Sequence, residues 1–143
     1  MEYLDDVIGF NTVLTGKYIS RLLNFHLKPY KLTAEQWTVL KRLDQLGEMS
    51  QTKLSEETSK DQATLTKILD LLERNGFIQR VKNPNDRRSF LICITDAGRK
   101  LTNELYDVVG DLFEKVTANL SKQELESYQK VLVEIRKNIQ NIM

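Results

Sequence analysis

The stretch DQATLTKILDLLERNGFIQRVKNPNDRRSFLICITDAG, residues 61–98, changes its hydrophobic pattern halfway along. Up to Arg74 its apolar residues recur at helical spacing, and the Asn-Gly pair that follows is a typical helix end. Beyond this pair, runs of strand-forming residues at 77–81 and 90–94 flank an Asn-Pro-Asn-Asp turn. The stretch therefore predicts a helix that is followed directly by a β-hairpin.

Three further helices are predicted before this stretch. Apolar residues at helical spacing over about 4–28 indicate one long helix, which Pro29 ends. Thr33 and Gln36 have the spacing of a capping box at the start of a second helix, which ends at Gly47. The short third helix and the fourth helix each begin at a candidate N-cap, Ser50 and Asp61 respectively.

Two long helices are predicted after it. Thr95 is the expected cap of the first, and Ser121 with Glu124 forms a second capping box at the start of the last. The terminal helices of the chain carry more apolar surface than a small core of helices and strands can cover. We expect them to interdigitate with those of a second copy, and packing on each other within one chain is the alternative.

The predicted fold class is mainly α with a small β-hairpin (α+β). Three short helices followed by a hairpin form the order of a winged helix-turn-helix, in which the hairpin is the wing. We expect a single chain over 1–143, with this DNA-binding region at 32–95. The residues at 1–31 and 96–143 are expected to form a helical dimerisation region.

Charge is distributed unevenly along a chain whose net charge is only +1. Residues 60–101 contain nine Lys and Arg against five Asp and Glu, so the remainder is slightly acidic. This asymmetry is typical of a nucleic-acid-binding segment inside a neutral protein.

Several classes of protein are disfavoured by composition. No apolar run approaches the roughly 18 residues of a membrane helix, and the acidic start MEYLDDVIGF does not resemble a signal peptide, so we expect a cytoplasmic protein without a membrane partner. One cysteine and one histidine predict no disulfide framework, no metal site and no cofactor. The sequence shows no nucleophile-base pair and no glycine-rich phosphate loop, so we do not expect an enzyme.

The helix after the turn is the expected recognition helix, which enters the major groove with its first turns. Gln62 can pair with adenine, and Lys67 can neutralise a phosphate. Threonine side chains can hydrogen-bond bases or phosphates and offer a methyl group to thymine. The candidate DNA-binding residues are Gln62, Ala63, Thr64, Thr66 and Lys67. The alternative is that they form an ordinary solvated helix face.

Four segments together resemble the MarR family, the multiple-antibiotic-resistance-type regulators: LTAEQWTVLKRL (32–43), SQTKLSEETSKDQATLTKILDLLERNGFIQR (50–80), NPNDRRSF (83–90) and LICITDAGRKL (91–101). The combination of the N-G-F-I step, the D-R-R wing and the I-T-D-A-G helix entry is the most specific part. The resemblance implies a winged-helix homodimer that binds a palindromic operator in double-stranded DNA and is released by a small ligand or by oxidation.

Carried over to this chain, the family pattern assigns wing roles to Asn85, Asp86, Arg87 and Arg88. It implies that Asp86 pairs with Arg88 as a brace and that an arginine at the tip, Arg87, reaches the minor groove. A narrow A·T-rich minor groove attracts a guanidinium, which gives a physical reason for this role. An ordinary soluble loop residue is the alternative for Arg87.

The resemblance also implies an effector pocket where the terminal helices meet the winged helix. Its candidate lining here is Arg21, Phe25, His26, Tyr30 and Trp37, which suits a small aromatic or carboxylate compound. In the alternative, Phe25 and Trp37 belong to the core and His26 to the surface.

The only cysteine, Cys93, lies in the second arm of the hairpin, whereas oxidation sensing in the family uses a reactive cysteine in the first helix. Nothing nearby in the sequence lowers the pKa of its thiol, so a structural role is favoured over a redox role.

The sequence thus favours a homodimeric, sequence-specific transcriptional regulator, a repressor released by a small molecule. A winged helix that binds an acidic protein partner through its basic hairpin is the competing interpretation.

Overall fold

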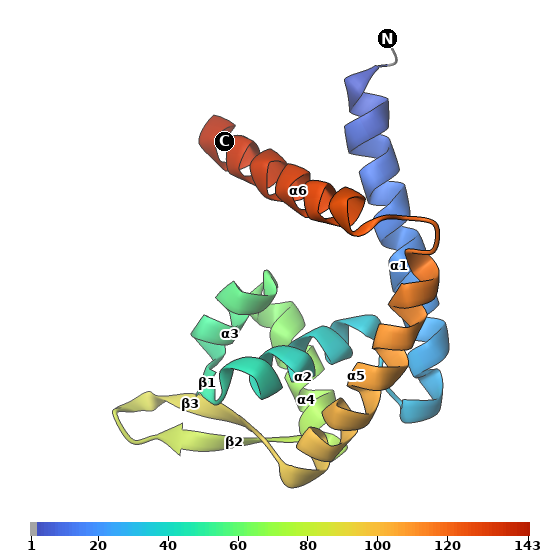
Figure 1. The fold of residues 1–143 in the computed structure, drawn as a ribbon. Helices are drawn as coiled ribbons and strands as arrows, with labels where there is room; N and C mark the ends of the chain where they lie inside the picture. The colour runs from blue at the N-terminus through green and yellow to red at the C-terminus, as the bar shows by residue number, and fades with distance from the viewer. Residues whose placement is uncertain (1–2) are drawn as a thin grey trace. The chain divides into compact units, whose positions relative to one another are not determined.

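The computed structural model describes residues 3–143 (Figure 1). Its elements follow in the order η1 (Asp5–Phe10), α1 (Asn11–Leu27), η2 (Lys28–Tyr30), α2 (Ala34–Leu46), β1 (Met49–Ser50), α3 (Gln51–Thr58), α4 (Gln62–Arg74), β2 (Ile78–Asn83), β3 (Asp86–Ile94), α5 (Asp96–Val116) and α6 (Lys122–Ile142). The predicted fold class, mainly α with a small β-hairpin, is confirmed. No helix within residues 3–143 has the length and apolar character needed to cross a membrane.

The chain divides into two compact units, one up to Tyr106 and the other from Asp107 onward. The first contains every element from η1 to β3 and the first half of α5. The second contains the rest of α5 and α6, which begins at the predicted capping box: Ser121 Oγ accepts from the Glu124 N–H at 3.0 Å, and Glu124 accepts from the Ser121 N–H at 2.9 Å. The hydrogen bond from the Ser121 main chain lowers the pKa of Glu124.

The helix starts in the first unit also match the sequence-based expectations. Thr33 and Gln36 form a reciprocal capping box at the start of α2, with bonds of 3.1 and 3.2 Å. Ser50 accepts from the N–H of Lys53 at the start of α3. A further bond, unforeseen in the sequence, runs from the Ala34 N–H to Asn24 Oδ1 at 2.7 Å and joins α1 to the first residue of α2.

The first helix covers the predicted range but is not α-helical throughout. Residues 5–10 form a π-helical segment, and the α-helix ends at Leu27. Pro29 lies inside the short 3-10 helix η2, where its fixed φ is tolerated, and Lys31 then takes a left-handed conformation with φ 60°.

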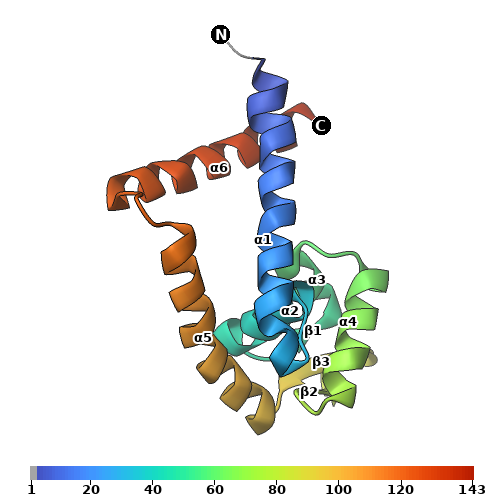
Figure 2. The same cartoon turned by 90° about the vertical axis from the view of Figure 1, so that its right-hand side faces the viewer.

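The core of the first unit is built mainly from leucines of α2, α3 and α4. The helix-turn-helix pair α3 and α4 lies side by side (Figure 2), and both contact α2. The largest side chains that are fully buried come from these helices, from both long strands, from the end of α1 and from the middle of α5: Leu27, Leu40, Leu43, Leu54, Leu65, Leu69, Leu72, Ile78, Ile92 and Leu105.

The predicted hairpin is present, but it belongs to a three-stranded antiparallel sheet of order β1-β3-β2. Strand β1 was not predicted: it comprises two residues, with Met49 opposite Ile92 and Ser50 opposite Leu91. A two-residue strand has no period for a sequence pattern to reveal, and its partner lies more than 40 residues away. It is the edge strand of the sheet next to β3, and α3 follows it directly in the chain.

The two ends of the hairpin are fastened to each other. The Thr95 N–H bonds to the Phe77 carbonyl oxygen at 3.0 Å, and Thr95 Oγ1 donates to the Gly76 carbonyl oxygen at 2.6 Å. The same hydroxyl accepts from the Gly98 N–H at 3.1 Å, as the predicted cap of α5. A Cβ on Gly98 would lie 2.2 Å from the Phe77 carbonyl oxygen and 2.8 Å from Ile94 Cγ1.

We therefore expect Gly98→Ala to destabilise the chain. The added methyl group meets main-chain atoms that cannot rotate away, so the free energy of unfolding should fall by about 1–3 kcal/mol, which is typical of overpacking. Chemical denaturation measures this change.

Gly110→Ala is the matched control, because it lies in the same helix and a Cβ there meets no heavy atom within 4 Å. It should be neutral or stabilising by about 0.5–1 kcal/mol, as expected for Gly to Ala in a helix. Equal effects of the two substitutions would contradict the close approach at Gly98.

Candidate nucleic-acid interface

Helix α4 turns its apolar face inward and its polar face outward. Leu65, Leu69 and Leu72 are fully buried, and Ile68 nearly so. Of the five candidate DNA-binding residues on this helix, Thr64 is half-buried and the others are exposed: Gln62, Ala63, Thr66 and Lys67. The predicted outward face is therefore available to a partner.

Asp61 caps α4 and also holds a threonine of its first turn. Its carboxylate accepts from the Thr64 N–H at 2.7 Å and from the Thr64 hydroxyl at 3.0 Å. These two bonds, the main-chain one first, lower the pKa of Asp61. The carboxylate is therefore ionised at neutral pH and stabilises the N-terminus of the helix.

Thr66 is held by two neighbours. Its hydroxyl donates to the Gln62 carbonyl oxygen at 2.8 Å, and Gln51 Nε2 donates to the same hydroxyl at 2.8 Å. Gln51 is the first residue of α3, so this bond links the two helices of the helix-turn-helix. Sequence patterns did not reveal the role of Gln51, because the contact joins residues 15 apart in the chain.

Arg80 of β2 fastens the wing to the recognition helix, and sequence patterns missed this role too. Its guanidinium lies 2.7 Å from Asp70 and 2.6 Å from Glu73, both on α4. Glu73 also accepts from the Arg80 main-chain N–H at 3.1 Å. The Arg80 side chain is only 18% exposed, so these two charge-assisted hydrogen bonds are partly shielded from water.

The tip of the wing is tighter than the predicted loop. Strands β2 and β3 extend to a two-residue turn at 84–85, with Asn83 opposite Asp86. The preceding pair is Lys82 with Phe90, so residues 87–89 form a bulge in β3. Arg87 and Arg88 are therefore exposed strand residues beside the turn, not residues of a loop tip.

Hydrogen bonds within the wing hold this bulge. Asp86 Oδ1 accepts from the main-chain N–H of Arg88 at 3.0 Å, while Asn83 accepts from the Asn85 N–H at 3.0 Å and donates to Ser89 at 3.2 Å. No ion pair joins Asp86 to the Arg88 guanidinium within residues 3–143. The connection between Asp86 and Arg88 thus differs from the side-chain pairing implied by the family, because it uses the main chain.

Part of the basic excess is neutralised inside the protein. Besides Arg80, Lys60 lies 3.6 Å from Glu35, and its side chain is 15% exposed. In the described part of the chain, Lys67, Arg87 and Arg88 form no ion pair. The cations without an acidic partner thus include those on the recognition helix and the wing.

The five candidate pocket residues have different environments. Trp37 is 4% exposed, and Tyr106 meets it edge-on at 5.6 Å, so Trp37 belongs to the core. Phe25 is 75% exposed and meets the exposed His26 edge-on at 5.2 Å, so the alternative that Phe25 lies in the core of this chain is wrong. The Arg21 guanidinium lies over the ring of Tyr18, and Tyr30 is half-buried. An effector site at these residues stays a prediction.

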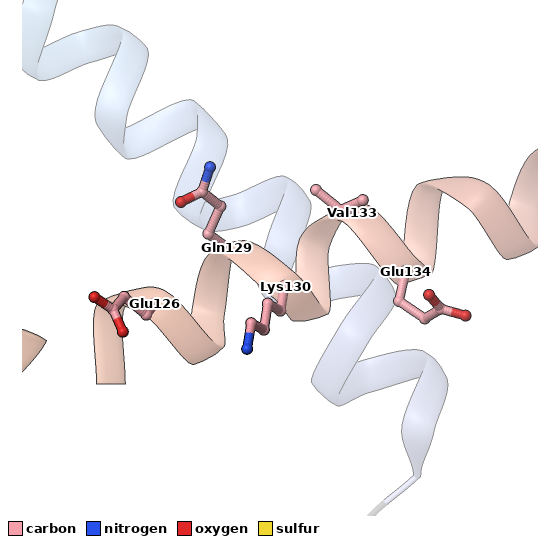
Figure 3. Close-up of a pocket in the computed structure, with 5 residues that line it drawn as sticks. All are labelled: Glu126, Gln129, Lys130, Val133 and Glu134. Atoms are coloured by element: carbon pink, nitrogen blue, oxygen red, sulfur yellow. The ribbon is translucent and has the colours of Figure 1, made fainter. Parts of the chain in front are cut away.

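A shallow hollow in the second unit is lined by residues of α6 alone (Figure 3): Glu126, Gln129, Lys130, Val133 and Glu134. None of them is among the predicted pocket residues. Across residues 3–143, no group of three or more His, Cys, Asp or Glu side chains is arranged to hold a metal ion.

Cys93 is a partly buried thiol beside a carboxylate. Its Sγ donates to Glu48 Oε2 at 3.2 Å. Burial raises the pKa of the Cys93 thiol to about 11, and the bond to Glu48 and its negative charge add to the shift. The thiol is therefore protonated at neutral pH, which supports the structural interpretation over the redox one.

Comparison with known proteins places this chain among regulators. A family model described as MarR family matches residues 32–90. The multiple antibiotic resistance protein MarR of Escherichia coli (strain K12) is 33% identical over 116 residues, which cover 80% of this chain and 81% of that protein.

Two solved structures are similar over nearly the whole chain. A cysteine-to-serine mutant of MarR from E. coli, complexed with operator DNA, has a TM-score of 0.82 at 28% identity and covers 94% of this chain and 99% of its own. A probable transcriptional regulator from Pseudomonas aeruginosa has a TM-score of 0.84 at 30% identity, with coverage of 93% and 99%.

The contacts of Arg80 predict that Arg80→Ala loosens the wing. We expect faster amide hydrogen exchange in β2 and β3, and a loss of about 1 kcal/mol of stability, since solvent screens the two half-exposed carboxylates. Arg74→Ala is the matched control, because Arg74 is an exposed arginine at the end of α4. Unchanged exchange in the hairpin of Arg80→Ala would exclude the fastening role.

The raised pKa predicts slow modification of Cys93. At pH 7 a pKa of about 11 leaves about 100-fold less thiolate than the ordinary value of 9.0. Alkylation by iodoacetamide should therefore be far slower than in the urea-unfolded chain, and its rate should rise with pH towards 11. Glu48→Gln removes the negative charge, lowers the pKa and should speed alkylation; a native rate equal to the unfolded one would contradict this environment.

Proposed function

Because this chain belongs to the MarR family, we propose that it is a transcriptional regulator, a repressor, that binds an inverted-repeat operator in double-stranded DNA as a homodimer. One observation supports this most strongly: Arg80 joins the wing to α4, so that the recognition helix and the wing, with its unpaired arginines, are directly connected. Such a connected pair can contact a major groove and the adjacent minor groove together.

On the recognition helix, Gln62 has an amide that can pair with adenine, and Lys67 has an unpaired charge for a phosphate. On the wing, Arg87 is exposed on a bulge held by Asp86, a geometry suited to a narrow A·T-rich minor groove. The phosphate contacts set affinity and its salt dependence, whereas the base contacts set specificity.

A homodimer is supported by exposed apolar side chains on the helices outside the winged helix. In the first unit, Phe10 is 63% and Phe25 75% exposed; in the second, Ile142 is 84% exposed. Apolar surface of this kind marks an interaction site. Residues 1–31 and 96–143 are therefore the proposed dimerisation region, and two recognition helices related by twofold symmetry would address half-sites about one helical turn apart.

The effector is proposed to be a small aromatic or carboxylate compound that releases the protein from DNA. Phe25 and His26, which contact each other near the end of α1, are the part of the predicted lining that has exposed aromatic surface. The protein is proposed to act in the cytoplasm and to catalyse no reaction.

Selection of duplexes from a random double-stranded library tests this function. We expect an enriched inverted repeat, whose binding weakens steeply with salt and is much tighter than that of a scrambled duplex. Single half-sites should bind poorly. No enrichment, or equal affinity for the scrambled duplex at every salt concentration, would refute the proposal.

The wing geometry predicts unequal roles for its two arginines. Arg87→Ala should weaken operator binding severalfold and reduce the salt slope by about one ion, without changing thermal stability. Arg88→Ala should leave the order of the wing unchanged, because Asp86 bonds to the main-chain N–H of Arg88.

Asp86→Ala removes the acceptor and should speed hydrogen exchange in the wing, whereas Asp86→Asn keeps an acceptor oxygen and should have a smaller effect. If Arg88→Ala and Asp86→Ala changed exchange equally, the main-chain bond would not be the brace.

A further inference from the structure

The hydroxyl proton of Thr64 is already used in a hydrogen bond within the protein. The Thr64 hydroxyl lies 3.0 Å from Asp61 Oδ2. The pKa of Asp61 is lowered, so its carboxylate is ionised and can only accept. Thr64 must therefore be the donor in this bond.

The hydroxyl proton of Thr66 is also used in a hydrogen bond within the protein. Its hydroxyl lies 2.8 Å from the Gln62 carbonyl oxygen, which can only accept, so Thr66 donates its single proton there. One of its lone pairs is then used by Gln51 Nε2 at 2.8 Å. The amide orientation of Gln51 follows, because a hydroxyl whose proton is already shared with a carbonyl needs a donor at this position.

These bonds also determine which part of each side chain faces a partner. A threonine in a helix has two accessible χ1 rotamers, and the bond to its own helix selects one. With the oxygen bonded back to Asp61 or to Gln62, the Cγ2 methyl group is the group left for contact. The exposed methyl of Ala63 immediately precedes Thr64 in the sequence. In the major groove, the only apolar group on a base edge is the C5 methyl of thymine.

Resting on the proposed function, we infer that Thr64 and Thr66 recognise thymine methyl groups through Cγ2 and donate no hydrogen bond to DNA. Gln51, which lies outside the recognition helix, is a positioning residue that holds the Thr66 rotamer. Both threonines then select for thymine and cannot donate to guanine or to phosphate oxygens.

The test compares two substitutions at each threonine on the duplex that the wild-type protein selects from a random library. Valine keeps the shape and a methyl group but loses the hydroxyl, whereas serine keeps the hydroxyl and loses the methyl. We expect Thr64→Ser and Thr66→Ser each to weaken binding about fourfold, the value of one buried methyl group. Thr64→Val and Thr66→Val should remain within about twofold of wild type. The reverse order would overturn the inference.

A second measurement needs no protein variant. Deoxyuridine replaces thymidine at single positions of the same duplex and removes only the C5 methyl group. Wild-type binding should fall about fourfold at the contacted positions, and each serine variant should lose this discrimination at one of them. If uracil binds as well as thymine at every position, the inference is wrong.

The role of Gln51 has its own readout. The serine variants identify which base each threonine contacts. Gln51→Ala should reduce the preference for thymine over uracil at the base contacted by Thr66, and leave it unchanged at the base contacted by Thr64. A uniform loss at both bases would indicate only a general structural role. Failure to select any duplex would refute the proposed function and this inference together, whereas a selected duplex with weak valine variants would refute only the inference.

Discussion

The burial of one face of α4 is the constraint on which the other features of the DNA-binding region depend. Leu65, Leu69 and Leu72 lose all contact with water in the core. Each residue turns an α-helix by about 100°, so this packing allows only one rotation of α4 about its axis. The rotation in turn determines that Gln62 and Lys67 face outward, and that Asp70 and Glu73 reach Arg80 of the wing.

Local features of this fold could be predicted from the sequence, and long-range ones could not. The capping boxes at Thr33 and Ser121 join residues three apart, so their spacing alone reveals them. The Gln51–Thr66 bond, the Arg80 contacts with α4 and strand β1 join segments that only the packed core brings together. Neither composition nor the positions of turn residues indicate which distant residues form such pairs.

The candidate site shows the same division. The pattern of buried leucines indicated which residues of α4 face outward, but not that the hydroxyl groups of Thr64 and Thr66 are bonded within the protein. Likewise, the count of basic residues in 60–101 included Lys60 and Arg80, whose charges are matched by carboxylates. A count of charged residues gives the net charge of a segment, whereas the ion pairs within the protein show which of its cations remain free to contact a partner.

The fastening of Gly76 and Phe77 to Thr95 has a consequence for how this fold can vary in evolution. The two ends of the hairpin are joined by hydrogen bonds at its base. These bonds connect the end of α4 to the start of α5 and do not involve the residues at the tip of the wing. Residues added to the turn at 84–85 would alter the local bonds of the wing tip, such as that of Asn85 to Asn83, and add a closure entropy that grows slowly with loop length, but they would leave the base of the hairpin unchanged. The reach of the wing can therefore diverge between related proteins independently of the core, as a module that adapts to operators of different groove width.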